Sequence, residues 1–271
     1  MNRTELIAAI TTKRSCLCVG LDSDPDKVPA HLRNTSDPVF EFNRRIIDAT
    51  RDLCVAYKPN TAFYEANGAS GWETLRKTAD YIGDQHLRIA DAKRGDIGNT
   101  SERYAKAFFE KMSYDAITVA PYMGADSVSP FLGFQGKWVI VLAHTSNPGS
   151  ADFQLFPSGE HALYEEVIRK SRQWAGPGQL MFVVGATHSD QISKIRRMAP
   201  DNFFLVPGVG AQGGSLEEVM EKGMNADCGL LINASRSIIY ASSGEDFEEA
   251  ARAEALRMQQ VMDRYLTAAG R

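Results

Sequence analysis

The chain has 271 residues, of which 44% are hydrophobic and 24% are charged. These fractions are those of an ordinary globular protein, so they exclude a wholly disordered chain and a fibrous one. With 30 lysines and arginines against 34 aspartates and glutamates, the net charge is only −4. This small negative net charge indicates neither a nucleic-acid partner nor binding to an anionic lipid surface.

No segment of the sequence has the pattern of a membrane span or of a secretory signal. The longest clean apolar run, Trp138 to Ala143, is much shorter than the roughly 18 residues that a spanning helix requires. The N-terminal segment contains only five consecutive apolar residues, Leu6 to Ile10, with no small-residue cleavage pattern after them. We therefore expect a short N-terminal helix, a cytoplasmic location and no membrane partner.

Eight short hydrophobic runs alternate with longer stretches of helical periodicity. The runs are nearly continuous rather than alternating, which is typical of parallel strands covered on both faces. The predicted strands comprise residues 16–22, 54–60, 87–93, 116–121, 138–145, 181–187, 203–209 and 228–234. The predicted helices comprise residues 39–52, 70–84, 100–112, 161–174, 190–198, 215–222 and 245–266.

Repeated strand–helix units predict an α/β fold, a single (β/α)8 TIM barrel that forms one catalytic domain over residues 1–271. The alternative is an open, doubly wound sheet. No Gly-x-Gly-x-x-Gly fingerprint follows the first predicted strand, where Gly20 and Asp22 lead into a turn rich in Asp and Pro, and this favours the barrel. Residues 147–159 are rich in Gly, Pro and Ser and predict a long loop on the active face.

The densest polar cluster, Asp91 to Asp96, begins in the last residues of the third predicted strand, at the end of a barrel where chemistry occurs. Side chains two residues apart on a strand share a face, so Asp91 and Lys93 are expected to point the same way. Together with Lys58 they would place carboxylate and ammonium groups in a partly dry cleft. A lysine flanked by carboxylates stays protonated, which suits a positioned cation and proton donor. The alternative is an exposed ladder of ion pairs, but charges in a buried strand are costly unless a site uses them.

A second cluster combines a glycine-rich segment, Pro207 to Gly214, with Ser235 and Arg236 after the last predicted strand. Glycines let backbone N–H groups approach an anion at the start of a helix, although a tight turn alone would also explain them. The guanidinium of Arg236 suits a phosphate group. Both features together predict a phosphate site, which barrels often hold after strands seven and eight.

Together these motifs resemble the orotidine 5'-phosphate decarboxylase family over essentially the whole chain. The chain length resembles the longer branch of that family, and the string DAKRGDIGNT is highly specific. The matching segments are GLDSDPD (20–26), YKPNTAFYEA (57–66), DAKRGDIGNT (91–100), TSNPGS (145–150), VPGVGAQGG (206–214) and NASRSIIYAS (233–242). The resemblance implies decarboxylation of orotidine 5'-phosphate to UMP in de novo pyrimidine synthesis, with no cofactor and no metal, by a homodimer with shared active sites.

The resemblance also implies roles for the charged residues. Asp22 would hold the ribose, and Lys58 would bridge the ribose and Asp91. Asp91, Lys93 and Asp96 would form the charged network at the reacting carbon. In that network Lys93 would stabilise the carbanion at carbon 6 and then protonate it.

The other residues that match positions of the family would bind the substrate. Asp96, Ile97 and Thr100 would reach into the site of the neighbouring subunit, and Ser146 would read the pyrimidine edge. Pro207, Gln212, Ser235 and Arg236 follow the last two strands, where Gln212 and Arg236 would grip the phosphate. Ser235 departs from the glycine of compact family members, which leaves its contact with the phosphate open.

Three other functions remain open. A metal-dependent phosphosugar decarboxylase or aldolase on the same barrel would need an additional carboxylate at the second strand, where Lys58 stands instead. A Schiff-base aldolase would need a neutral amine at Lys93 or Lys58, which the flanking carboxylates oppose. A nucleotide sensor without activity would not need Asp91, Lys93 and Asp96 intact.

Overall fold

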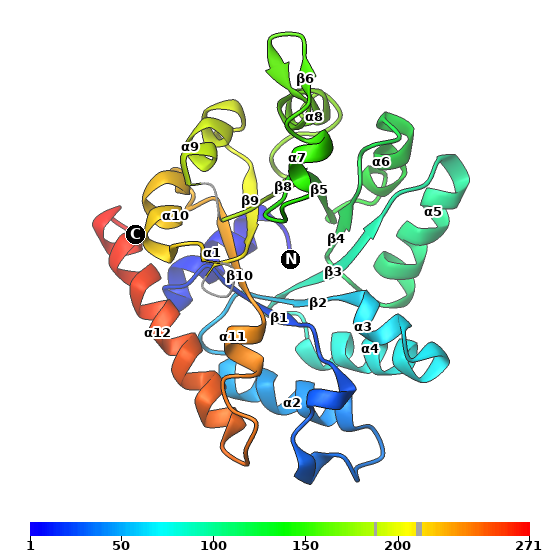
Figure 1. Ribbon diagram of the computed structural model, residues 1–271, viewed down its shortest axis with the longest axis vertical. Helices are drawn as coiled ribbons and strands as arrows, with labels where there is room; N and C mark the ends of the chain where they lie inside the picture. Colours follow the sequence, from blue (N-terminus) through cyan, green and yellow to red (C-terminus); the bar gives the residue numbers. More distant parts are fainter. Residues whose placement is uncertain (187–188, 210–212) are drawn as a thin grey trace.

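A computed structural model of the chain describes residues 1–186, 189–209 and 213–271. Eight parallel strands form a closed barrel in the order β1-β10-β9-β8-β5-β4-β3-β2, with β1 paired to both β10 and β2. Figure 1 shows the strands at the centre with the helices arranged around them. The predicted (β/α)8 barrel is therefore confirmed, and the open sheet, whose edge strands do not meet, is excluded.

Each barrel strand overlaps one of the eight predicted hydrophobic runs. Nearly all their side chains are buried, because each strand faces the barrel interior on one side and helices on the other. The strands are β1 Leu17–Leu21, β2 Ala56–Pro59, β3 Leu87–Arg94, β4 Ala116–Val119, β5 Trp138–His144, β8 Leu180–Val184, β9 Phe203–Pro207 and β10 Leu230–Ala234. The short strands β6 Pro157–Ser158 and β7 His161–Ala162 form an antiparallel hairpin outside the barrel. Strand β6 lies in the segment predicted as a long loop, and β7 occupies the first two residues of the predicted helix 161–174.

The outer helices match the seven predicted ones and add α6, which the sequence did not indicate. The long elements are α2 Pro38–Thr50, α4 Gly68–Ile82, α5 Gly98–Lys106, α6 Ala125–Leu132, α8 Leu163–Ser171, α9 Ser189–Met198, α10 Leu216–Gly223 and α12 Phe247–Ala268. The short ones are α3 Thr61–Glu65, α7 Ser150–Phe153, α11 Arg236–Ile239, the 3₁₀ turns η1 Pro25–Lys27 and η2 Ala30–Leu32, and the π-helical turn η3 Ala107–Lys111. Helix α6 contains Pro130, which weakens the helical signal, and the burial of Val128 and Phe131 on one face stabilises it.

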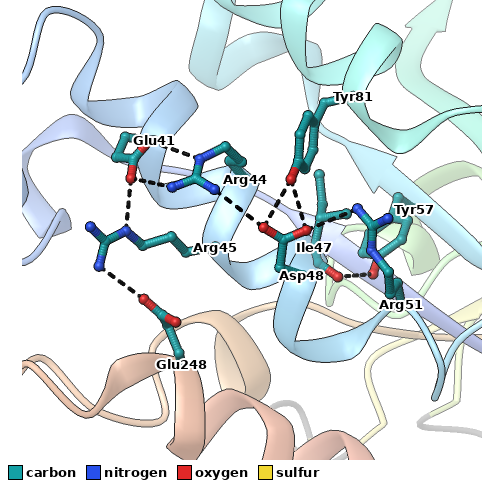
Figure 2. A network of polar contacts seen from close by, with 9 residues as sticks. All are labelled: Glu41, Arg44, Arg45, Ile47, Asp48, Arg51, Tyr57, Tyr81 and Glu248. Atoms are coloured by element: carbon teal, nitrogen blue, oxygen red, sulfur yellow. Dashed lines mark hydrogen bonds and ion pairs between the residues drawn. The ribbon is translucent and has the colours of Figure 1, made fainter.

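Polar contacts tie α2 to the helices on either side of it (Figure 2). Arg45 donates to Glu41 at 2.8 Å on its own helix and to Glu248 of α12 at 3.0 Å. On the other side, the hydroxyl of Tyr81 in α4 donates to both oxygens of Asp48, at 2.8 and 2.9 Å. Because α12 follows the last barrel strand and α2 follows the first, the contact between Arg45 and Glu248 bridges the seam at which the barrel closes.

The N-terminal helix α1 Arg3–Lys13 covers the end of the barrel at which the strands begin. Its side chains Leu6 and Ile10 are buried, and the Met1 ammonium lies 2.9 Å from Asp115, the residue before β4. This contact fixes the start of the chain against the amino-terminal end of the barrel. In the part of the chain that the structure describes, no helix combines the length and the apolar character needed to cross a bilayer.

The buried carboxylate of Asp115 provides a test of this contact. It accepts hydrogen bonds from the backbone N–H of Arg88 at 3.0 Å and from Arg88 Nε at 3.1 Å, besides its contact with Met1. Burial opposes the charged form, but these partners outweigh it and lower the pKa of Asp115. Asp115→Asn should reduce the free energy of unfolding by roughly 2–4 kcal/mol at pH 7, because it leaves buried cations without their counter-charge.

Urea denaturation measures this effect, and Asp84→Asn is its matched control. Asp84 also contacts Arg88, at 3.4 Å, but its side chain is 94% exposed, so little change is expected. Because the folded pKa of Asp115 is lowered, its contribution is present above the ordinary carboxyl pKa of about 3.9. The difference between wild type and Asp115→Asn should therefore shrink as the pH falls below that value. Equal losses in the two variants would contradict a buried, paired role for Asp115.

Candidate active site

A lysine–aspartate–lysine cluster, Lys58, Asp91 and Lys93, lies at the carboxyl ends of β2 and β3, and we call it the charged triad. Lys58 Nζ is 2.7 Å from Asp91 Oδ2, and Lys93 Nζ is 2.6 Å from Asp91 Oδ1. The side chain of Lys58 is 4% exposed, that of Asp91 is 11% exposed and that of Lys93 is 50% exposed. One carboxylate is thus held between an ammonium group inside the barrel and another at its mouth.

The two buried members of the triad keep each other charged. Burial disfavours the ammonium form of Lys58, but the charges of Asp91 and Asp22 outweigh it and raise the pKa of Lys58 above its ordinary value. Burial also disfavours the charge of Asp91, but Lys58 and Lys93 together hold the pKa of Asp91 well below its ordinary value. Both groups therefore carry their charge throughout the physiological pH range.

The backbone of β3 is irregular where it carries Lys93. The φ angle of Lys93 is 46°, in the left-handed region that residues other than glycine seldom adopt. The pairing of β3 with β4 also shifts register between Ala90 and Arg94. The expectation that Asp91 and Lys93 share a face through regular strand alternation therefore does not describe this segment. Their side chains meet because the ammonium of Lys93 reaches Asp91 from an irregular backbone.

A cavity of about 380 Å³ opens at the mouth of the barrel beside the charged triad. This volume lies within the range of small-molecule sites. Apolar side chains from β5, β8 and β9 form one part of its wall, and polar residues after β5 form another. Besides the triad, the lining consists of Thr118, Leu142, Thr145, Ser146, Asn147, Gln154, Val183, Leu205 and Pro207. The structure thus brings five predicted residues together: Lys58, Asp91, Lys93, Ser146 and Pro207.

The polar wall after β5 is held by Gln154, which the sequence analysis did not single out. Its Oε1 accepts the backbone N–H of Thr145 at 2.8 Å, and its Nε2 donates to Thr145 Oγ1 at 2.9 Å. Thr145 Oγ1 in turn donates to Asn147 Oδ1 at 2.6 Å. On the other side, a Cβ at Gly185 would lie 2.7 Å from the backbone nitrogen of Ser146, so only glycine allows β8 to approach so closely. No periodicity or motif in residues 147–159 indicates the contact of Gln154.

Thr118 is a second residue that the sequence analysis did not identify. It lies on β4, is 1% exposed and lines the cavity. Its hydroxyl accepts the backbone N–H of Lys93 at 2.9 Å and donates to Asp91 Oδ1 at 3.1 Å. The sequence feature that could have identified Thr118 is its hydroxyl, which is the one polar side-chain group in the strand Ala116–Val119.

Asp22 follows β1 and lies close enough to Lys58 for its charge to raise that residue's pKa. Its Oδ1 atom is buried and has no hydrogen-bond partner among the described residues. A buried acceptor without a donor costs free energy that a ligand hydroxyl could recover. Asp22 does not itself line the 380 Å³ cavity.

Asp96, Ile97 and Thr100 lie at the start of α5 and do not line the cavity of their own chain. Asp96 Oδ1 accepts the N–H of Ile97 at 2.8 Å, and the carbonyl of Asp96 accepts the hydroxyl of Ser101. Ile97 is 52% exposed. The structure therefore separates these three predicted residues from the charged triad of the same chain.

Ser235 and Arg236 lie at the junction of β10 and α11. The guanidinium group of Arg236 forms no ion pair with any residue that the structure describes. The Ser235 side chain is turned toward β1, because a Cβ added to Gly20 would lie 1.8 Å from Ser235 Oγ. Asn233 Nδ2 donates to the same oxygen at 3.4 Å. Gln212, the other predicted phosphate ligand, lies outside the described residues.

The contact between Gly20 and Ser235 predicts a compensating pair of substitutions. Gly20→Ala places a Cβ 2.8 Å from Ser235 Cβ, which rotation of the hydroxyl cannot relieve, so unfolding free energy should fall by about 1–3 kcal/mol. Adding Ser235→Gly removes the clashing atoms and should restore most of the loss. Denaturation of the two single variants and the double variant measures the coupling. Strictly additive effects would show that the two residues do not compete for this space.

The comparisons with known proteins agree on one family. A family model described as "Orotidine 5'-phosphate decarboxylase / HUMPS family" matches residues 15–253. The orotidine 5'-phosphate decarboxylase of Flavobacterium johnsoniae is 57% identical over 265 residues, which cover 97% of each chain. That of Bacteroides fragilis is 55% identical over 273 residues, which cover 99% of each chain.

A solved structure gives the same result. The structure of Leishmania donovani OMP decarboxylase superposes with a TM-score of 0.83 at 37% identity and covers 97% of this chain and 99% of its own. The family model extends from just before β1 into α12, so it spans the whole barrel and every element that carries the charged triad and the cavity. The chain therefore belongs to the orotidine 5'-phosphate decarboxylase family.

Proposed function

We propose that this protein converts orotidine 5'-phosphate to UMP and carbon dioxide, without a cofactor, as a step of de novo pyrimidine synthesis. The observation that carries the proposal is the charged triad at the mouth of the 380 Å³ cavity. Full-length similarity to proteins named orotidine 5'-phosphate decarboxylase supports the same reaction.

The chemistry of the reaction explains why such a triad is needed. When the bond between carbon 6 and the carboxylate breaks, carbon dioxide leaves and the electron pair stays on carbon 6, in the plane of the ring, where it does not delocalise. Stabilisation must therefore come from fixed charges in the site. In our proposal the ammonium of Lys93 stabilises this pair and then transfers a proton to carbon 6, after which solvent reprotonates the lysine.

Asp91 and Lys58 act on the same step in different ways. Asp91 holds the Lys93 ammonium by a 2.6 Å contact and would lie near the departing carboxylate, whose charge it repels. Lys58 keeps Asp91 charged inside the barrel and would contact the ribose together with Asp22. The Oδ1 atom of Asp22, which has no partner among the residues that the structure describes, offers an acceptor to a hydroxyl.

The remaining residues would bind the parts of the substrate that do not react. Ser146 and Pro207, on the cavity wall, are assigned to the pyrimidine. Arg236, Ser235 and Gln212 are assigned to the phosphate, and the exposed guanidinium of Arg236 supports this role. Binding energy from a remote phosphate can drive expulsion of water around the ring.

A homodimer with shared sites is part of the proposal. Asp96, Ile97 and Thr100 lie outside the cavity of their own chain, so they are free to complete the cavity of a second copy. Apolar side chains are exposed on the same side of the barrel: Ile97 at 52%, Tyr122 at 85% and Met123 at 47%. We also propose a cytoplasmic location, because phosphorylated nucleotide precursors do not cross membranes unaided.

A metal-dependent phosphosugar decarboxylase or aldolase is the second candidate, since the family description gives a second name beside orotidine 5'-phosphate decarboxylase. Such an enzyme would use carboxylate oxygens as ligands of a divalent ion. Here the Lys58 ammonium occupies Asp91 Oδ2 at 2.7 Å, and this arrangement favours the metal-free reaction.

The proposed reaction predicts a large effect of Lys93→Ala on turnover. Loss of orotate-ring absorbance should follow addition of orotidine 5'-phosphate to chelator-treated wild type. In Lys93→Ala the rate should fall on the order of 10³-fold or more, because the fixed cation and the proton donor are both lost. Binding of UMP should stay within a few-fold of wild type.

The substitution of an exposed lysine, Lys170→Ala, is the control and should keep full activity. Activity that disappears on chelation would favour the metal-dependent alternative, and near-normal rates in Lys93→Ala would overturn the assignment.

The shared-site proposal predicts complementation between two inactive variants. Lys93→Ala and Asp96→Ala should each be inactive as homodimers. After unfolding and refolding together in equal amounts, half of the dimers would be mixed, and each mixed dimer would hold one intact site. About one quarter of wild-type activity should then return. A mixture as inactive as its components would show that Asp96 does not act in the site of a partner subunit.

A further inference from the structure

Thr118 links two residues of the triad, Asp91 and Lys93. Its side chain lies on β4, between the buried Ile117 and Val119, and points at the end of β3. A single hydroxyl oxygen lies 2.9 Å from the backbone nitrogen of Lys93 and 3.1 Å from Asp91 Oδ1. The hydroxyl therefore contacts the main chain of Lys93 and the carboxylate of Asp91.

The backbone of Lys93 needs this contact. Where the β3–β4 register shifts, the N–H of Lys93 has no place in the regular ladder, and a partly buried N–H without an acceptor costs free energy. Thr118 Oγ1 supplies that acceptor. It thereby supports the left-handed backbone at Lys93, with its φ of 46°, which directs the side chain to Asp91.

The direction of the hydrogen bonds fixes Asp91 as well. Because Lys93 N–H can only donate, Thr118 accepts there and keeps its own proton for Asp91 Oδ1. That carboxylate oxygen also receives Lys93 Nζ at 2.6 Å, while Oδ2 receives Lys58 at 2.7 Å. Three donors from three strands thus define the plane of the Asp91 carboxylate.

We infer that Thr118 is a positioning residue for the proposed decarboxylation, on which this inference rests. By joining the main chain of Lys93 to the carboxylate of Asp91, its hydroxyl sets where the ammonium stands relative to the reacting carbon. The substrate binds through other groups, so loss of the hydroxyl should affect the chemical step and not the affinity.

Substitutions that remove or keep the Thr118 hydroxyl test this role. Thr118→Val keeps the shape of the side chain and removes the hydroxyl, and it should lower kcat about 10- to 100-fold, the effect of a small misplacement of a catalytic group. KM for orotidine 5'-phosphate and Kd for UMP should stay within about threefold. Thr118→Ser keeps the hydroxyl and should retain most of the turnover.

A second pair of variants keeps the test decisive if Thr118→Val does not fold. Thr118→Ala and Thr118→Ser differ only by the oxygen, and urea denaturation of both shows whether each is folded under assay conditions. If both fold and turn over equally fast, or if Thr118→Val keeps wild-type kcat, the positioning role is overturned. A proportional rise in KM with unchanged kcat would also overturn it. Wild type without decarboxylase activity would instead refute the proposed function itself.

Discussion

The charge of Asp91, held between Lys58 and Lys93, is the constraint on which the rest of the site depends. A carboxylate that is 11% exposed is unfavourable unless cations compensate it, and Lys58 inside the barrel has the same need for an anion. Neither charge would persist there alone. Parallel pairing of β2 with β3 makes the pair possible, because it places the carboxyl ends of these strands side by side. Lys93 stands at the same ends, at the mouth of the barrel, where a ligand can reach it.

The irregular backbone at Lys93 is supported from both sides. Thr118 accepts its N–H, and the next residue, Arg94, pairs with Glu65 at the end of α3. The guanidinium of Arg94 also lies 5.2 Å from the ring of Tyr104, and a second ring, that of Phe108, is 5.5 Å away. A conformation that is unfavourable by itself thus persists because its neighbours are fixed, as is common where a protein positions a reacting group.

Much of the fold and part of the site could be predicted from the sequence. The strands were predictable because burial on both faces leaves a continuous hydrophobic run, and the ends of those runs identified Lys58, Asp91 and Lys93. Helix α6 was missed because a proline obscured its short apolar pattern. The contacts of Thr118 and Gln154 depend on strand register, on a shift in the β3–β4 pairing and on the path of a loop, none of which has a period in the sequence.

The charged groups at the two ends of the barrel have different roles: those at the amino-terminal end stabilise the fold, and those at the carboxyl end are available to a ligand. At the amino-terminal end, Asp115 is satisfied by Arg88 and by the chain terminus, so this end stabilises the closed barrel without a ligand. At the carboxyl end, Asp22 Oδ1 is buried without a partner and Arg236 has no counter-ion among the described residues. These two groups would gain most from a ligand that carries hydroxyls and a phosphate, and Asp22 lies near Lys58 of the triad. Under the proposed function, binding energy from these two groups would help to hold the reacting ring against Lys93, although neither group contacts the bond that breaks.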